Sequence, residues 1–274
     1  MPTGTDARFQ LRVSHADRVV THSEHNAEAL RGLGVEAEVL VVSHPPNLAV
    51  RQTPLPPRPP IELLFLGYVR PYKGLDTAIE AVRVLVDDGL DVRLTVAGAF
   101  WEPAQRYRDM VRRFGLQEHV ALKEGFVPDD AVPALLERCH LLVLPYKSAG
   151  QSGVVPLAFA AGRPVVVTDV GGLPDQVSAG VNGELACAGD RASLADAIWR
   201  ASMDLEKTCA WCCALAFRVG RTCAKPSSLS LLNVCETVSC YLSSCPVTTR
   251  RSASTAQAPL RPCSSKCGVF LCAS

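Results

Sequence analysis

The sequence lacks the long apolar segments of a membrane protein. It has no run of 18 apolar residues, and its N-terminus has no basic segment followed by an apolar one. We therefore expect neither a membrane-spanning helix nor a signal peptide, and a cytoplasmic location is the default. The net charge is only +1, so the totals do not indicate a nucleic-acid-binding protein. A hydrophobic content of 48% is enough for a sizeable core.

Cysteine is nearly absent from most of the chain. Cys139 and Cys187 are the only two before residue 209, and the other ten lie in residues 209–272. The first 200 residues are therefore typical of an enzyme from a reducing compartment, whereas the cysteine content of the tail does not fit that description.

The tail, residues 204–274, has three acidic residues against eight basic ones and no persistent helical or alternating period. Three interpretations stay open: a disulfide or zinc module, a disordered appendage and a shifted reading frame. CAWCC at Cys209–Cys213 supports the first, but no second CxxC pair stands at zinc-finger spacing. The abrupt change of composition, just where a final helix should continue, favours a shifted frame.

From Ile61 onward, apolar strands alternate with helices. This alternation predicts βαβ units, and hence a parallel sheet with right-handed crossovers. We predict an α/β fold over residues 61–203: a doubly wound, Rossmann-like parallel sheet of six strands with helices on both faces. Strands are expected at 61–67, 91–98, 119–125, 140–146, 164–168 and 183–186, and helices at 75–89, 103–114, 129–138, 154–161 and 191–201.

The residues before Ile61 are too few for a complete second domain. Residues 1–44 predict two strands and one helix with Ser23 as its N-cap, and we interpret them as the remnant of an N-terminal domain. Residues 45–60 are proline-rich and predict an extended linker.

One stretch, residues 149–175, combines two glycine turns with a short helix and a buried strand. The Gly171–Gly172 pair allows its backbone to approach another segment closely. In the first turn, free amides and the dipole of the following helix point the same way, which attracts anions. We therefore predict a phosphate-bearing ligand beside Gly150, Gln151, Ser152, Gly153 and Val154.

Two cations follow the first strand of the predicted sheet, in GYVRPYKGLD from Gly67 to Asp76. Arg70 can form planar bidentate hydrogen bonds and Lys73 supplies a point charge. The pair is therefore suited to neutralise a diphosphate.

Two further turns follow strands. In GFVPDD, Phe126 and Val127 would expose apolar surface and backbone groups suited to a flat base, and Asp129 or Asp130 is expected to cap the next helix. In AGAFWEP, Trp101 can stack on a ring or pack on its own helix.

Together these motifs resemble those of a known enzyme family. Residues 61–201 are similar to the C-terminal, donor-binding half of a retaining family-4 glycosyltransferase of the GT-B fold, and residues 12–44 resemble the last elements of the N-terminal half. The motifs that carry the resemblance are GYVRPYKGLD, LTVAG, GFVP, LLVLPY and AAGRPVVVTDVGGLPD.

The resemblance implies a role for each motif. Arg70 and Lys73, in the motif that begins at Gly67, would bind the diphosphate of a nucleotide-diphosphate sugar. Backbone near Val127 would meet the base, and the turn Gly150–Val154 would hold sugar and phosphate. No metal or other cofactor is expected.

This sequence departs from the family pattern in two respects. The family often has two glutamates eight positions apart, one for the sugar and one for the ribose, but Ala149 and Leu157 stand at these positions. Gln151 and Ser152 offer polar groups for the sugar instead. Most of the N-terminal domain, which in the family supplies the acceptor site, is expected to be missing, so no catalytic residue is assigned.

The resulting expectation is a hexosyltransferase-type glycosyltransferase that transfers a sugar to a saccharide or lipid acceptor in envelope or polysaccharide biosynthesis. Two alternatives stay open: a catalytically incomplete module that binds a nucleotide sugar, and a GT-B epimerase that acts on the donor itself. Any contact with the inner face of the membrane would run through the missing N-terminal domain.

Overall fold

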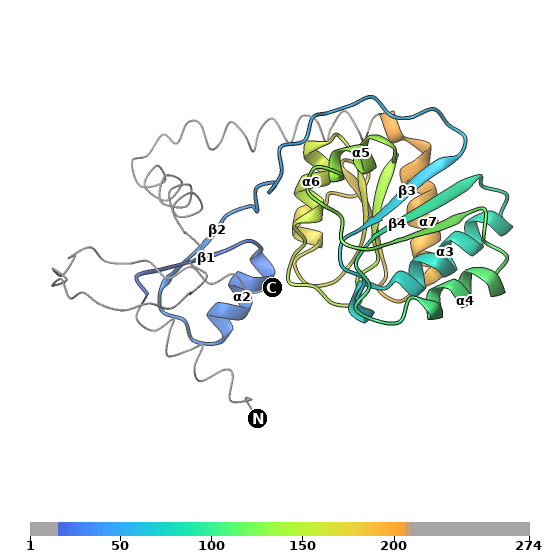
Figure 1. Cartoon of the computed structure of the whole chain (residues 1–274). Helices are drawn as coiled ribbons and strands as arrows, with labels where there is room; N and C mark the ends of the chain where they lie inside the picture. The colour runs from blue at the N-terminus through green and yellow to red at the C-terminus, as the bar shows by residue number, and fades with distance from the viewer. Residues whose placement is uncertain (1–15, 207, 209–274) are drawn as a thin grey trace, which may run out of the picture.

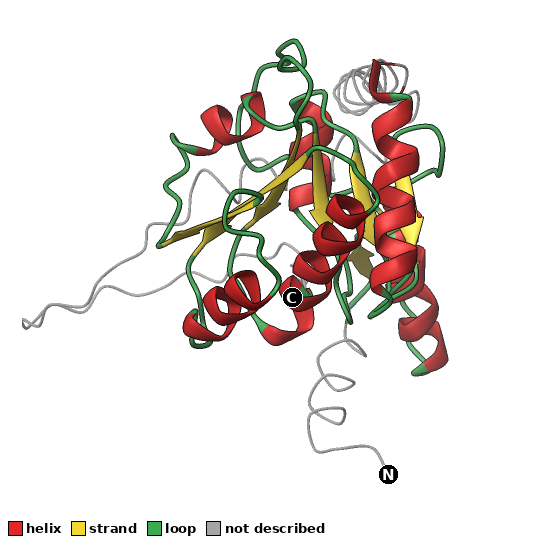
Figure 2. Ribbon diagram, turned by 90° about the vertical axis from the view of Figure 1, so that its right-hand side faces the viewer, coloured by secondary structure: helices red, strands yellow, loops and turns green. Residues whose placement is uncertain are grey.

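The fold is taken from a computed structural model that describes residues 16–206 and residue 208. A six-stranded parallel sheet with helices on both faces makes up most of the described chain (Figure 1 and Figure 2). A small parallel unit precedes it, formed by β1 (Arg18–Thr21), α2 (Glu24–Gly32) and β2 (Glu38–Val41). The predicted cap of α2 is confirmed, because the Ser23 side chain accepts a hydrogen bond from the amide of Asn26 at 3.2 Å.

The prediction of a doubly wound α/β sheet is confirmed. The strand order is β5-β4-β3-β6-β7-β8, and every pair is parallel. The chain therefore builds outward from β3 in one direction and then from β6 in the other, which places a topological switch point between these two strands. The strands are β3 (Ile61–Leu66), β4 (Val92–Gly98), β5 (Val120–Glu124), β6 (Leu141–Leu144), β7 (Val165–Thr168) and β8 (Gly183–Ala186).

Both faces of the sheet are covered, which explains the uninterrupted apolar runs of its central strands. On β3, Leu63 and Phe65 face one core, whereas Leu64 and Leu66 face the other. Helices α3 (Leu75–Asp87), α4 (Gln105–Arg113) and α7 (Arg191–Met203) pack on the first face, and α5 (Val132–Glu137) and α6 (Val154–Ala160) pack on the second (Figure 1).

The expected cap of α5 is wrong. The helix begins at Val132 rather than at Asp129, and its N-cap, Ala131, makes no side-chain hydrogen bond. Pro133 stands in the first turn of the helix, the only place where a helix accepts proline without losing a hydrogen bond. It therefore fixes the start of α5 and leaves Asp129 and Asp130 in the preceding loop.

The tail predicted to begin at residue 204 is described only over its first residues. Leu205 is buried in the core, and Thr208 donates a backbone hydrogen bond to the carbonyl of Asp204 at 3.0 Å. The three interpretations of the cysteine-rich tail otherwise concern residues 209–274, which lie outside the described residues.

A buried arginine fastens the proline-rich segment to the domain. Arg163 has no exposed surface, and its guanidinium donates to the carbonyls of Leu136 (2.9 Å), Thr53 (2.8 Å) and Pro54 (2.9 Å). It also donates to the Thr53 hydroxyl at 2.7 Å. The second half of the predicted linker therefore lies against the domain.

A buried histidine holds the same segment a few residues further on. His140 accepts a hydrogen bond from the amide of Glu62 at Nδ1 (2.9 Å), and its Nε2 lies 3.0 Å from the carbonyl of Pro56. Because Nδ1 accepts, Nε2 carries the proton and donates. Burial lowers the pKa of His140, which keeps the ring in the neutral form that this pair of bonds requires.

Replacing Arg163 should unfold the domain more easily. Arg163→Met leaves several buried oxygen atoms without a donor, so we expect the free energy of unfolding to fall by about 3 kcal/mol. Urea unfolding followed by circular dichroism measures this change. Arg93→Met, which removes an exposed arginine from β4, is the matched control and should change stability by less than about 0.5 kcal/mol. Equal midpoints for the two variants would contradict this account of Arg163.

Candidate functional site

A cavity of about 840 Å³ opens at the carboxyl ends of β3 and β6, where the strand order reverses. Ligands of doubly wound sheets bind at such a switch point. The loops after β3, β4, β5 and β6 line the cavity, together with residues from the N-terminal part of the chain. All nine residues predicted as donor-binding from the sequence line it: Gly67, Arg70, Lys73, Val127, Gly150, Gln151, Ser152, Gly153 and Val154. Their role in binding remains a prediction.

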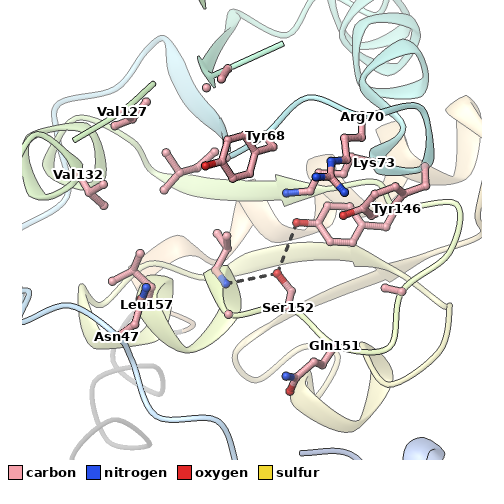
Figure 3. A pocket seen from close by; sticks show the side chains of 18 of the residues that line it. Asn47, Tyr68, Arg70, Lys73, Val127, Val132, Tyr146, Gln151, Ser152 and Leu157 are labelled. Carbon is pink, nitrogen blue, oxygen red and sulfur yellow. Dashed lines mark hydrogen bonds between the residues drawn. The ribbon is translucent and has the colours of Figure 1, made fainter. Parts of the chain in front are cut away.

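The cavity has a cationic end and an apolar end. Figure 3 shows Arg70 and Lys73 beside Tyr146 at one end. Val127, Val132 and Leu157 lie together at the other. An elongated ligand with a charged part and a flat, weakly polar part would match this division.

The two cations have no acidic partner among the residues that the structure describes. No ion pair within the described residues involves Arg70 or Lys73, and the Arg70 Nε atom is buried without a hydrogen-bond partner. The Arg70 guanidinium lies over the ring of Trp101, 3.9 Å from its centroid, and Lys73 Nζ lies 5.2 Å from the centroid of Tyr146. Burial and the nearby charge of Arg70 lower the pKa of Lys73 to about 8. No acidic side chain in the described part of the chain therefore compensates the positive charge at this end.

Lys147 stands between two residues that line the cavity, Tyr146 and Ser148, and it does have an acidic partner. Its ammonium group lies 2.7 Å from Asp76, whose carboxylate also accepts a hydrogen bond from Arg106 at 3.1 Å. These charges neutralise one another and fasten the loop after β6 to the start of α3. Lys147 is therefore structural. Among the described residues that line the cavity, the lysine and arginine without an ion pair are Lys73 and Arg70.

The close approach predicted for the glycine pair is confirmed, and its partner is the turn after β6. A Cβ atom on Gly171 would lie 1.5 Å from the carbonyl oxygen of Ala149, and one on Gly172 would lie 2.3 Å from that of Gly150. The amide of Gly172 donates to the Gly150 carbonyl at 3.1 Å. The second glycine turn thus packs backbone to backbone against the first.

Gln176 also holds the first turn, a contact that the sequence does not reveal. Its Oε1 accepts from the amide of Ser152 (3.1 Å), and its Nε2 donates to the carbonyl of the same residue (3.2 Å). The Ser152 hydroxyl accepts from the amide of Val154 at 3.3 Å and bonds to Tyr146 at 3.4 Å (Figure 3). Because the amides of Ser152 and Val154 are already bonded within the protein, anion binding would rest mainly on the two cations.

Residues before the domain complete the cavity. Asn47 lies near Leu157 at the apolar end (Figure 3), and His25 lines the cavity while its amide donates to Asp175 at 3.1 Å. His44 lies near Gly153, where an added Cβ atom would be 3.8 Å from the His44 ring. Sequence reasoning missed Asn47 and His25, since neither stands in a motif.

Two further properties concern the described residues as a group. Over 16–206 and 208, no cluster of three or more histidine, cysteine, aspartate or glutamate side chains could hold a metal ion. Within the same residues, no helix is both long and apolar enough to span a bilayer.

Comparison with known proteins places the chain in a family. The model of the family described as glycosyl transferases group 1 matches residues 60–204, more than half of the chain. The chain belongs to the group 1 glycosyl transferases. Most residues that line the cavity lie within this matched segment, whereas His25, Asn47 and Leu48 precede it.

Two curated relatives are named as biosynthesis glycosyltransferases. WcaL of Escherichia coli K12, named for a glycosyltransferase role in colanic acid biosynthesis, is 30% identical over 200 residues, which is 68% of this chain and 48% of the relative. The amylovoran biosynthesis glycosyltransferase AmsK of Erwinia amylovora is 29% identical over 149 residues, covering 52% of this chain and 36% of the relative. The chain spans about half the length, or less, of these relatives.

A solved structure shares the fold of this glycosyl transferase. HepE of Anabaena, in complex with UDP and glucose, matches with a TM-score of 0.64 over 88% of this chain and 68% of that one. The sequence identity is 21%, so the match concerns the fold.

Removing the charge of Lys73 should stabilise the ligand-free protein. The pKa of about 8 in the folded state lies below the ordinary 10.5, so folding disfavours the charged lysine at neutral pH. We expect Lys73→Met to raise the melting temperature at pH 7, by an amount that shrinks between pH 8 and pH 10.5 as the wild-type lysine loses its proton. Differential scanning calorimetry over this pH range tests the trend.

Lys123→Met is the control, because Lys123 is exposed on β5 and belongs to no ion pair of the described residues. Its melting temperature should follow that of the wild type at each pH. A Lys73→Met protein that melts below the wild type throughout would show that the lysine stabilises the fold rather than a ligand.

Proposed function

We propose that this chain contains the donor-binding half of a retaining, family-4 glycosyltransferase, which transfers a sugar from a nucleotide-diphosphate sugar to a saccharide or lipid acceptor. The observation that carries the proposal is the uncompensated pair Arg70 and Lys73 at the switch point of the sheet. Two cations held without an acidic partner lower the stability of the empty protein, and a bound diphosphate would relieve this cost.

The same pair suits the chemistry of sugar transfer. When the bond between the sugar and the nucleotide breaks, negative charge develops on the departing diphosphate. Fixed positive charges aimed at that group stabilise the transition state more than the ground state, because their own reorganisation is already complete. Arg70 offers several donors in one plane, and Lys73 is charged below pH 8.

The rest of the donor would lie along the cavity. The apolar end would receive the nucleoside, with the base against the loop of Val127 and the ribose near Leu157. Gln151 lines the cavity and has a buried Oε1 atom without a hydrogen-bond partner, so it would accept a hydrogen bond from a sugar hydroxyl.

The acceptor and the cellular setting rest on the named relatives. Colanic acid and amylovoran are the products named for the two relatives above, and both support a role in envelope or polysaccharide biosynthesis. Such relatives do not favour the epimerase or the inactive binding module. A cytoplasmic location, with contact to the inner face of the membrane, remains part of the proposal.

Binding of nucleoside diphosphates tests the proposal. We expect one of UDP, GDP and ADP to raise the melting temperature of the whole chain, since a ligand that binds only the folded state stabilises it by mass action. Arg70→Ala with Lys73→Ala should remove the shift, whereas the matched double variant Arg93→Ala with Lys123→Ala, on exposed positions, should retain it. A cooperative transition that none of the three ligands moves would refute the proposal.

The apolar wall at Leu157 makes a second measurement informative. Leucine cannot accept a hydrogen bond from a ribose hydroxyl, so a nucleoside diphosphate and its 2′-deoxy analogue should bind with dissociation constants within about threefold of each other. Isothermal titration calorimetry gives both constants. A preference for the ribonucleotide of more than about tenfold would show that another group reads the ribose.

A further inference from the structure

We propose that Trp101 is a positioning residue that orients Arg70 for the diphosphate, an inference that rests on the proposed function. The sequence leaves open whether Trp101 stacks on a ring or packs on its own helix. In the structure its indole packs against the side chain of Arg70 and, edge-on, against the ring of Tyr68. The Arg70 guanidinium covers the indole face at 3.9 Å, and α4, which begins at Gln105, buries Tyr107 and Val111 instead.

The backbone fixes Trp101 relative to Arg70. The pairing of β3 with β4 continues past both strands, because the amide of Val69 donates to the carbonyl of Ala99 (2.9 Å) and the amide of Trp101 donates to that of Val69 (3.0 Å). Arg70 directly follows Val69. The same hydrogen-bonded pair of backbone segments therefore positions both Arg70 and Trp101.

A second aromatic ring holds the indole in place. Tyr68 lies edge-on to Trp101, with ring centroids 5.6 Å apart and planes inclined by 71°. Tyr68 also lines the cavity, whereas Trp101 does not and is 63% exposed. Trp101 would therefore act on a ligand through Arg70 rather than by direct contact.

An aromatic partner serves an anion-binding arginine better than an acidic one. A carboxylate beside Arg70 would also orient the guanidinium, but it would cancel much of the charge that a diphosphate needs. Stacking on Trp101 restrains the plane of the guanidinium and leaves its charge and its edge free. The buried, unpartnered Nε of Arg70 fits this arrangement, since no group of the described residues competes for it.

Binding of inorganic pyrophosphate and of UDP, GDP and ADP to three proteins tests the inference: the wild type, Trp101→Leu and Trp101→Phe. We expect Trp101→Leu, which keeps an apolar side chain without an aromatic face, to weaken pyrophosphate and the bound nucleoside diphosphate about fivefold. Trp101→Phe keeps a face for the guanidinium and should stay within about twofold. The ligand-free melting temperature should be the same in all three, because the side chain is 63% exposed.

Two further arms separate positioning from direct contact or from a loss of structure. In an Arg70→Met background, Trp101→Leu should have no additional effect on pyrophosphate affinity. The nucleoside without phosphate should bind equally to the three Trp101 proteins. Three results would each overturn the inference. They are weaker binding of the nucleoside to a Trp101 variant, an unchanged affinity of Trp101→Leu for pyrophosphate, and an additional loss of pyrophosphate affinity when Trp101→Leu is combined with Arg70→Met.

The same data distinguish this inference from the function on which it rests. If the wild type binds neither pyrophosphate nor any of the three nucleoside diphosphates, the donor site itself is wrong and the inference falls with it. If Arg70→Met abolishes binding while Trp101→Leu binds like the wild type, the donor site stands and only the role of Trp101 is lost.

Discussion

The site depends on two positive charges that the protein holds together without neutralising them. Arg70 and Lys73 come from one short turn after β3, and the ion pair of Lys147 with Asp76 includes neither of them. The burial of Lys73 and the nearby charge of Arg70 lower the pKa of the lysine, so folding disfavours its charged form. Within residues 16–206 and 208, aromatic rings rather than carboxylates lie against both groups.

Loop packing at the carboxyl edge of the sheet keeps this pair next to the rest of the cavity. The backbone of Gly171 and Gly172 packs against the turn after β6. The Gln176 side chain forms hydrogen bonds with both the amide and the carbonyl of Ser152. Ser152 in turn contacts Tyr146, the ring beside Lys73. The contact between Lys73 and the Tyr146 ring therefore joins this packed turn to the first half of the doubly wound sheet.

The sequence predicts the fold well because its signals are local. An apolar run such as that of β7 (Val165–Thr168) predicts a strand that is covered on both faces of the sheet. Glycine turns mark the ends of the strands. Contacts between distant segments carry no such signal: Gln176 lies 24 residues from Ser152, and Trp101 meets Arg70 only because two loops run in register. The cap expected at Asp129 or Asp130 is wrong because Pro133 fixes the helix start more strongly than a carboxylate does.

The most direct test of the central claim is a crystal structure of the chain with a bound nucleoside diphosphate. The account predicts that oxygen atoms of the diphosphate lie within hydrogen-bond distance of both Arg70 and Lys73, with the base at the end lined by Val127 and Leu157. A diphosphate bound elsewhere, or one in the cavity that touches neither cation, would contradict it.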